Sequence, residues 1–477
     1  MRLLKIVVSS FWISLLAHQA FSQADENQIL TPDSFLEKVL SNHPEAQKAG
    51  LQIDKAKFTI RSARGGFDPV IYGEHEEKKF HEKDYFNYTE AGVKVPTIAG
   101  LTFQAGFEQN SGIYQNPDQT VPDQGLGFLG VSVPLGQGFI IDERRKNLRK
   151  ANAEQEVFLA KRQNILNDLL YESMLVYWQW VGAHQLLQLS NDFYDAAFQK
   201  FDNTRTSFIQ GDKAAIDTTE AFIQVQEGIR MQLDAQIALQ NASLALENFL
   251  WNQEGGTESV QSWQPVAWSS QPFPKIFNED SLMNLVTWAE MQHPEILMYR
   301  GKALGLDVER AWKAEKLKPK VNLKYQLLAG VEEISGDLEE HGVYRNNFKW
   351  GLDLKFPVFL RKERGDLQLA KIKISETQLN WNNKRQQIRN KIIQYYQQWK
   401  ILENQVDVYT ETVALYTRMR DAERIKFDNG ESSLFLLNSR EQKWVQAKQK
   451  LIQLQQKYWK AYFSVLWASG QIGAFLL

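Results

Sequence analysis

The seven histidines are the residues best able to do chemistry in this chain, and their spacing argues against a catalytic or metal site. They are scattered at positions 18, 43, 75, 81, 184, 293 and 341. His75 and His81 share an acidic stretch where a metal could bind by chance, and His184 has no histidine neighbour on its predicted helix. The chain shows no phosphate-binding glycine loop and no nucleophile motif. It also has no cysteine, which excludes thiolate metal sites and disulfides. We therefore expect no enzyme activity, no metal and no cofactor.

The charge balance argues against a nucleic-acid-binding protein. The 477 residues include 55 basic and 57 acidic side chains, whereas a nucleic-acid binder should show a basic excess. Aromatic residues make up 12% of the chain, with 14 Trp. That content suits large packed interfaces or the aromatic girdles of membrane proteins. The length suggests two to four domains.

The N-terminus has the pattern of a secretory signal peptide over residues 1–22. Arg2 and Lys5 precede an apolar core, Ile6 to Leu16, and small residues stand at 20 and 22. We expect cleavage after Ser22 and a mature chain beyond the inner membrane. No later stretch offers ~18 uninterrupted apolar residues, so no membrane-spanning helix is predicted. A membrane location would then require a β-barrel.

A long helical stretch, Asp142 to Gln253, bends once near Gly211. A track of positions seven apart is apolar at six of its seven members: Leu166, Ser173, Trp180, Leu187, Tyr194, Phe201 and Phe208. A seven-residue period is typical of helices that supercoil with neighbours. A continuous helix from Asp142 to Gln210 would be roughly 100 Å long. A cytosolic coiled coil is the alternative interpretation of this pattern.

Residues 67–134 change to a period of two, which predicts β-strands with one apolar and one polar face. For example, Phe103, Ala105 and Phe107 are separated by polar or small residues. Two polar stretches, 76–84 and 109–124, are predicted as loops. Before the strands, residues 33–43 and 44–64 are predicted helices, the second opened by Pro44, whose fixed φ suits a first helical turn.

The chain then repeats itself. His43-Pro44-Glu45 recurs 250 residues later as His293-Pro294-Glu295. Four residues of the long hairpin recur 219 positions later: Tyr177, Trp180, Phe208 and Gly211 return as Tyr396, Trp399, Phe427 and Gly430. We predict a first structural repeat over 23–253, an irregular connector over 254–279 near the helical-barrel equator, a second repeat over 280–470 with strands over 321–357, and a tail over 471–477.

The first repeat has 27 extra residues in its strand region, which an additional hairpin turning near Thr97 to Gly100 accounts for. The sequence leaves open whether that hairpin, around 84–110, joins the main sheet.

Two or four strands per repeat cannot close a barrel within one chain. Several copies would have to contribute strands, which predicts a homo-oligomer with cyclic symmetry. One set of side chains would then face lipid (Trp350, Leu352, Leu354) and another a wet lumen (Lys324, Asp353, Lys355). A soluble sheet with one solvated face has the same alternation.

The mature sequence resembles the TolC family of outer-membrane efflux channels over essentially its whole length. The resemblance rests on duplicated segments in a fixed order: Asn42-His43-Pro44-Glu45 and Gln292-His293-Pro294-Glu295, Val133-Pro134-Leu135 and Phe356-Pro357-Val358, Phe208-Ile209-Gln210-Gly211 and Phe427-Asp428-Asn429-Gly430. It implies an internally duplicated α+β membrane protein, in which a trimeric transmembrane β-barrel continues into a long antiparallel α-helical coiled-coil barrel. It also implies the outer membrane of a Gram-negative bacterium, with the helical portion in the periplasm.

The function implied by this resemblance is the outer-membrane exit duct of a tripartite efflux or type I secretion system. Such a duct passively conducts substrates from a periplasmic adaptor (membrane fusion) protein and an inner-membrane pump of the RND, ABC or MFS type to the exterior. The expected partners are two further copies in a homotrimer, the adaptor, the pump and outer-membrane lipid, with no nucleic acid. The alternative is a periplasmic coiled-coil structural or adaptor protein without a membrane barrel.

The resemblance also implies roles at the two hairpin tips. The tip residues Gly211 and Asp212, with Gly430 and Glu431, would contact the adaptor, although glycine at these positions also serves simply to turn the chain. Family members can ring a closed aperture with acids six and nine positions after the tip glycine. Those positions are Asp217 and Glu220 in the first hairpin but Leu436 and Ser439 in the second, which departs from the family pattern. Asp217 and Glu220 are therefore the candidate aperture residues, or else two solvated acids on a helix face.

Overall fold

A computed structural model describes residues 28–114, 117, 120–266, 279–330 and 347–473. The predicted signal peptide lies outside these residues. So do residues 267–278 of the predicted connector, 331–346 of the loop in the second repeat, and 474–477 of the predicted tail.

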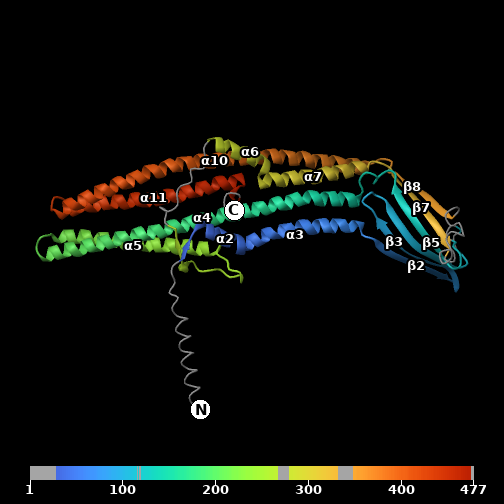
Figure 1. The fold of residues 1–477 in the computed structure, drawn as a ribbon, viewed down its shortest axis with the longest axis horizontal. Helices are drawn as coiled ribbons and strands as arrows, with labels where there is room; N and C mark the ends of the chain where they lie inside the picture. The colour runs from blue at the N-terminus through green and yellow to red at the C-terminus, as the bar shows by residue number, and fades with distance from the viewer. Residues whose placement is uncertain (1–27, 115–116, 118–119, 267–278, 331–346, 474–477) are drawn as a thin grey trace, which may run out of the picture. The chain divides into compact units, whose positions relative to one another are not determined.

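Eight helices of the described residues occur in the order that the sequence predicts (Figure 1). They are α2 (Pro32–Asn42), α3 (Pro44–Arg64), α4 (Glu143–Ile209), α5 (Ala215–Glu247), α6 (Glu279–Gln292), α7 (Pro294–Glu315), α10 (Arg361–Asp428) and α11 (Leu434–Ser469). Short 3₁₀ turns stand at η1 (Gly65–Phe67) and η3 (Val260–Ser262). The strands are β1 (Gln28–Leu30), β2 (Val70–Phe80), β3 (Lys83–Pro96), β4 (Thr102–Ser111), β5 (Leu126–Pro134), β6 (Trp263–Pro265), β7 (Lys320–Gly330) and β8 (Phe348–Lys355).

The helix after Gly211 is shorter than predicted, because α5 ends at Glu247 instead of Gln253. The chain turns there around Asn252, whose Oδ1 accepts hydrogen bonds from the backbone N–H groups of Glu254 (3.1 Å) and Gly256 (2.8 Å). Asn and Gly favour such turns because Asn bonds the nearby backbone and Gly tolerates positive φ. The helices predicted over 33–43 and 44–64 lie within one residue of α2 and α3.

The chain forms two compact units that cut across the predicted repeats. One unit comprises residues 51–162 and 294–385, and the other residues 1–50, 163–293 and 386–477. Each unit therefore takes part of both repeats. The repeat boundaries drawn from the sequence stay a prediction.

The first unit contains a six-stranded antiparallel sheet in the order β2-β3-β4-β5-β7-β8 (Figure 1). The additional hairpin turns at Thr97–Gly100, as predicted, and joins this sheet, since β3 pairs with β4 and β4 with β5. The turn is closed by Thr97, which accepts from Gly100 N–H (3.0 Å) and donates from both its N–H and Oγ1 to the carbonyl of Leu101.

The prediction of a polar loop over 76–84 is wrong. Strands β2 and β3 continue through this stretch and are joined only by His81 and Glu82, which both have positive φ. A two-residue turn of this kind matches the twist of a hairpin. The polar residues were mistaken for a loop because they pair across the strands; Lys79, for example, forms an ion pair with Asp84 at 3.2 Å.

The two faces of the sheet differ sharply. Residues directly opposite in an antiparallel ladder share a face. One register row is apolar across all six strands: Ile71, Val93, Ala105, Leu129, Leu327 and Phe348. A neighbouring row on the opposite face is polar or glycine from β3 onward: Lys94, Gln104, Gly130, Gln326 and Lys349. The predicted sets also separate: Trp350, Leu352 and Leu354 lie on the apolar face, and Lys324, Asp353 and Lys355 on the polar face.

The second unit is a helical bundle with an aromatic core. Trp178 and Trp459 stack with their ring centroids 4.2 Å apart, and Tyr177 donates its hydroxyl to the carbonyl of Leu30 at 2.7 Å. Burial raises the pKa of the Tyr177 hydroxyl. Leu30 ends β1, which pairs in parallel with β6. In the described part of the chain, no helix combines the length and the apolar character needed to cross a membrane.

The first copy of the duplicated Asn-His-Pro-Glu segment fixes a break between two helices. The Asn42 side chain donates to the carbonyl of Trp251 at 2.9 Å, and His43 stacks on Phe249. His43 Nδ1 accepts from the backbone N–H of Glu45, and Pro44 begins α3. Burial lowers the pKa of His43, which favours the neutral ring that this hydrogen bond requires. The segment therefore has a structural role in the bundle.

Candidate functional site: the two hairpin tips

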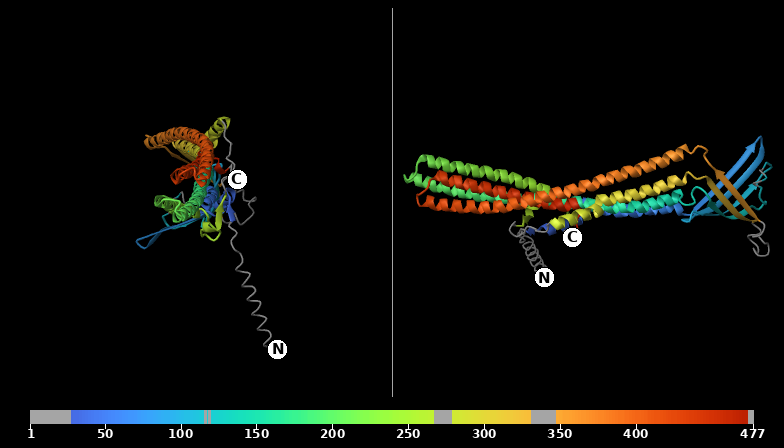
Figure 2. Two further views of the ribbon diagram at one scale, coloured as in Figure 1. Left: turned by 90° about the vertical axis from the view of Figure 1, so that its left-hand side faces the viewer. Right: turned by 90° about the horizontal axis from the view of Figure 1, so that it is seen from above.

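The two long helices each end in a hairpin turn, within the helical unit (Figure 2). Helix α4 is joined to α5 by residues 210–214, and α10 to α11 by residues 429–433. Gly211 and Gly430 adopt positive φ of 86° and 78°. A left-handed residue one position past the helix end is the geometry that glycine supplies without strain.

The two turns share the same backbone hydrogen bonds. At the first tip, Gly211 N–H donates to the carbonyl of Phe208 at 3.0 Å, and Asp212 N–H to Ser207 at 2.9 Å. At the second tip, Gly430 donates to Phe427 and Glu431 to Lys426, at 3.0 and 2.8 Å. This is the Schellman pattern, which satisfies carbonyls left free at a helix end. The side chains of Asp212 and Glu431 are exposed.

The helices that leave the tips are capped in complementary ways. At the first tip, Ala214 has no capping side chain, and the Asp217 carboxylate accepts from the Ala214 N–H at 3.3 Å. At the second tip, Ser433 Oγ accepts from the N–H of Leu436 at 3.3 Å. A full capping box has both bonds, so each tip holds one half of it. Asp217 is thus used in a cap, and Leu436 needs no charge because Ser433 caps that helix.

Glu220 belongs to a polar network that ties the first hairpin to α11. Its Oε1 accepts from Asn438 Nδ2 at 3.1 Å, and Asn438 Oδ1 accepts from Lys200 Nζ at 2.8 Å. Lys200 also forms an ion pair with Glu441. The side chains of Lys200 and Glu441 are only 11% and 13% exposed, and Asn438 is 4% exposed. A buried network of this kind is costly to disrupt, because each group lost leaves a partner unsatisfied.

A cleft of about 290 Å³ lies beside this network, between α4, α10 and α11. Lys213 of the first tip crosses it, with Nζ 5.2 Å from the ring centroid of Phe427 in the second hairpin. Apolar side chains next to the turns are open to solvent: Ile209, Ile216 and Phe435 are 74%, 75% and 70% exposed. Exposed apolar groups rimmed by charges are typical of protein–protein contact surfaces.

The structure brings Asp217 and Glu220 to the same helix near the first tip, but each has its own partner. Sequence reasoning missed Lys200, Asn438 and Glu441. The one available signal was Asn438, a polar residue directly after Leu437 in a stretch of α11 that is otherwise apolar, Leu434 to Leu437. The other two carry charges that look like ordinary solvated helix residues until their partners are known.

Comparison with known proteins gives the class of this chain. Residues 309–471 match the model of the outer membrane efflux protein family. Among solved structures, the chain is similar to the outer-membrane channel OprN (TM-score 0.66, 13% identity, covering 92% of this chain and 90% of that one). It is similar to the CmeC outer membrane channel of Campylobacter jejuni (TM-score 0.64, 14% identity, 94% and 86% covered) and to the open state of the MtrE outer membrane channel of Neisseria gonorrhoeae (TM-score 0.64, 10% identity, 92% and 88% covered). No curated protein matches the sequence.

These likenesses establish the fold as that of an outer-membrane channel. The outer membrane efflux protein model matches residues 309–471, which make up most of the second predicted repeat and about a third of the chain. The predicted resemblance to outer-membrane efflux channels and the predicted combination of long helical hairpins with an antiparallel sheet are thereby confirmed. The outer-membrane location is part of the proposed function below. The trimer, the adaptor contact and the aperture residues stay predictions.

Proposed function

We propose that this protein is the outer-membrane exit duct of a tripartite efflux or type I secretion system. It works as a homotrimer that receives substrates from a periplasmic adaptor and an inner-membrane pump and conducts them passively to the exterior. The observation that carries the proposal is the two-faced sheet. Its apolar register row crosses six strands, as a lipid-facing surface requires, and its polar rows suit a water-filled lumen.

The edges of the sheet support assembly with further copies. Within the described residues, β2 and β8 each pair on one side only, over 11 and 8 residues. Long unpaired edges bind other strands readily, and closing a barrel removes them. Three copies would supply eighteen strands, a size at which barrels enclose an aqueous channel. Pairing of β8 with β2 of the next copy closes the ring.

The tips support the adaptor contact. They combine rigid turns, exposed apolar residues such as Ile216 and Phe435, and exposed acids at Asp212 and Glu431. A partner that presents apolar side chains and cations would complement them. The specific pump and cargo are not encoded in this surface, because a passive duct leaves the choice of substrate to the pump.

Conductance of the purified protein in a planar bilayer tests the proposal. We expect small discrete current steps from a heat-sensitive trimer, as a duct that is narrowed at its tips would give. A variant with the network opened, Lys200→Met, should conduct more. If both the parent protein and this variant insert as trimers but stay silent, the duct is excluded. A folded helical protein that neither inserts nor forms trimers would favour a periplasmic structural role.

A further inference from the structure

The helix ends next to the sheet carry a dense set of cations, within a single compact unit. Residues 143–150 contain five basic and one acidic side chain, residues 310–320 five and one, and residues 361–364 three and one. Over the whole chain the basic and acidic residues nearly balance, at 55 and 57. The excess is therefore local. We call the basic residues of these three segments the basic collar.

Contacts show that the three segments converge. Two lysines contact the ring of Trp312, with Lys146 Nζ 4.0 Å and Lys316 Nζ 3.8 Å from its centroid. Lys313 forms a 2.6 Å ion pair with Asp366, near the start of α10. Both burial and the neighbouring Lys313 lower the pKa of Lys316. Positive charge is thus crowded at one place, where an additional anion would be favourable.

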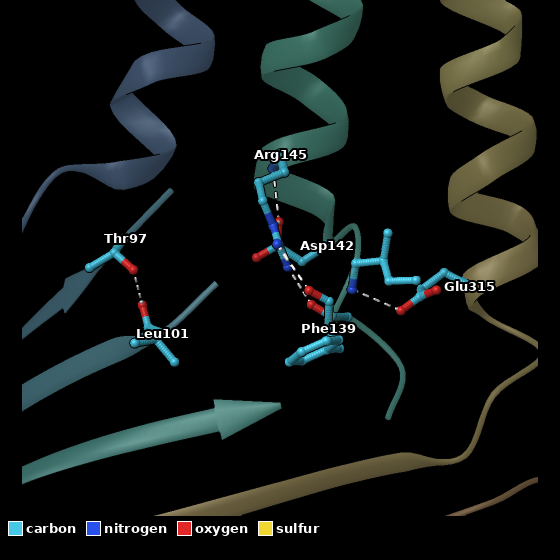
Figure 3. A network of polar contacts seen from close by, with 8 residues as sticks. Thr97, Leu101, Phe139, Asp142, Arg145 and Glu315 are labelled. Atoms are coloured by element: carbon cyan, nitrogen blue, oxygen red, sulfur yellow. Dashed lines mark hydrogen bonds and ion pairs between the residues drawn. The ribbon is translucent and has the colours of Figure 1, made fainter. Parts of the chain in front are cut away.

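Part of the collar is structural, and part forms no ion pair within the described residues. Arg145 is buried; it forms an ion pair with Asp142 at 3.2 Å and donates to the carbonyl of Phe139 at 3.0 Å (Figure 3). By contrast, Arg144, Arg361 and Lys362 are exposed, and no carboxylate of the described residues lies within 4.0 Å of their charged groups.

The position of these cations is unfavourable for the helices that carry them. Arg144 lies in the first turn of α4, and Arg361 and Lys362 begin α10. A helix N-terminus carries a partial positive charge, so cations there oppose the macrodipole. Stability of the isolated chain does not explain them, which indicates that an external anion does.

The connections between the strands and these helices carry exposed apolar residues. Phe139 and Ile140, between β5 and α4, are 59% and 58% exposed, and Val358 and Phe359, between β8 and α10, are 82% and 70% exposed. Arg361 lies 5.1 Å from the ring centroid of Phe359. Strand faces, exposed apolar connectors and cations follow one another in this order along the chain. The same order is found across a membrane surface, where aromatic rings sit at the headgroup level and cations reach the phosphates.

We propose that the basic collar binds anionic phospholipid headgroups at the periplasmic surface of the outer membrane. This rests on the proposed function, because that function places the apolar sheet face in the bilayer and the helices in the periplasm. The exposed connectors enter the acyl boundary, and the unpaired cations contact the lipid phosphates. Each cation near an anionic surface contributes about fivefold to such binding, and salt screens it.

The test compares two triple variants in phosphatidylcholine bilayers that contain phosphatidylglycerol. The collar variant carries Arg144→Gln, Arg361→Gln and Lys362→Gln. The matched control carries Arg418→Gln, Lys426→Gln and Lys443→Gln, three exposed cations of the helical unit. The measurement is the association of spin-labelled phosphatidylglycerol relative to phosphatidylcholine. We expect the parent and control to prefer phosphatidylglycerol, and the collar variant to lose about threefold or more of that preference. High salt should reduce the preference of the parent protein in the same direction.

Each other outcome is decisive. An unchanged preference in the collar variant overturns the proposal. So does a change in cation-to-anion permeability without a change in lipid preference, since the cations would then face the lumen. If the collar variant fails to fold, the charge-conserving variant Arg144→Lys with Arg361→Lys takes its place and should keep the preference for phosphatidylglycerol. Loss of that preference in the charge-conserving variant would also count against the proposal. Conductance in pure phosphatidylcholine separates the two hypotheses: a channel that conducts without lipid preference leaves the duct intact and removes only the collar.

Discussion

The two hairpin tips have the same backbone and different chemistry. Gly211 and Gly430 close identical Schellman turns, 219 positions apart. The first tip caps its outgoing helix with the Asp217 carboxylate, and the second with the Ser433 hydroxyl. The Glu220–Asn438 hydrogen bond joins the two hairpins, and the second tip has a further bond within its own hairpin, where Ser432 donates to Glu423 at 2.6 Å. The two copies therefore share the backbone geometry of the turn, whereas their helix caps and their side-chain hydrogen bonds differ.

This comparison gives a physical reason for the missing acid at position 436 of the second hairpin. A cap needs one acceptor near the first backbone N–H groups, and either the N-cap residue or the residue three positions later can supply part of it. Because Ser433 caps α11, the residue at position 436 need not supply an acceptor, and it is leucine. With alanine at 214, position 217 keeps its acid. The charge difference between the tips thus follows from their capping.

The largest effect is expected from Lys200→Met, which removes the cation at the centre of the network on the first tip. Glu441 and Asn438 would be left buried without their partner, at a cost of about 3 kcal/mol in the free energy of unfolding. Chemical unfolding measured by circular dichroism checks this, with Lys213→Met as the control because that exposed lysine lies over the Phe427 ring and forms no ion pair within the described residues. Equal stability of both variants would mean that the network does not couple the hairpin to α11.

The next largest effect is expected from alanine at the tip glycines. A Cβ at Gly211 or Gly430 meets no atom within 4 Å, so the cost arises from positive φ alone. We expect Gly211→Ala and Gly430→Ala to destabilise by about 1 kcal/mol each. Gly365, in the first turns of α10, also has open space around its Cβ but no positive φ, and Gly365→Ala should be neutral or slightly stabilising. Unequal costs at the two tips would break the claim that their turns are equivalent.

A smaller effect is expected from completing each half cap. Ala214→Ser adds the missing hydroxyl at the first tip, and Leu436→Glu adds the missing acid at the second. Each should stabilise its helix by about 0.5 kcal/mol, and Ser433→Ala should cost about 1 kcal/mol. Hydrogen exchange of the first-turn amides of α5 and α11 resolves these changes locally. If Ala214→Ser gave no added protection, the description of the first tip as half a capping box would be wrong.

The smallest effect is expected at the candidate aperture. Asp217→Asn with Glu220→Gln should weaken channel block by multivalent cations, by about threefold only, because both carboxylates already accept hydrogen bonds within the chain. Block is measured on single channels with the divalent or trivalent ion in solution. The control is Asp192→Asn, an exposed acid of α4 away from the tip. Block that stays at the parent level in the double variant would remove Asp217 and Glu220 from the gate.

The sequence by itself determined the local elements, because their signals are short-range. The seven-residue track, Pro44 and Pro294, and the tip glycines set the helices and their breaks, and the period-two alternation around Trp350 set the two faces of the sheet. Polar composition alone was ambiguous and gave a wrong prediction for residues 76–84. These residues belong to β2 and β3, where they pair with one another across the two strands.

Only the tertiary structure decided which distant residues meet. It placed the additional hairpin in the sheet, paired Glu220 with Asn438 across 218 positions, and brought both Lys146 and Lys316 to the Trp312 ring. Single charged residues on a long helix carry no mark of their partner in the sequence. Their environment depends on how helices far apart in the chain pack and turn about their axes, and that is fixed by the sum of many weak contacts rather than by any one segment.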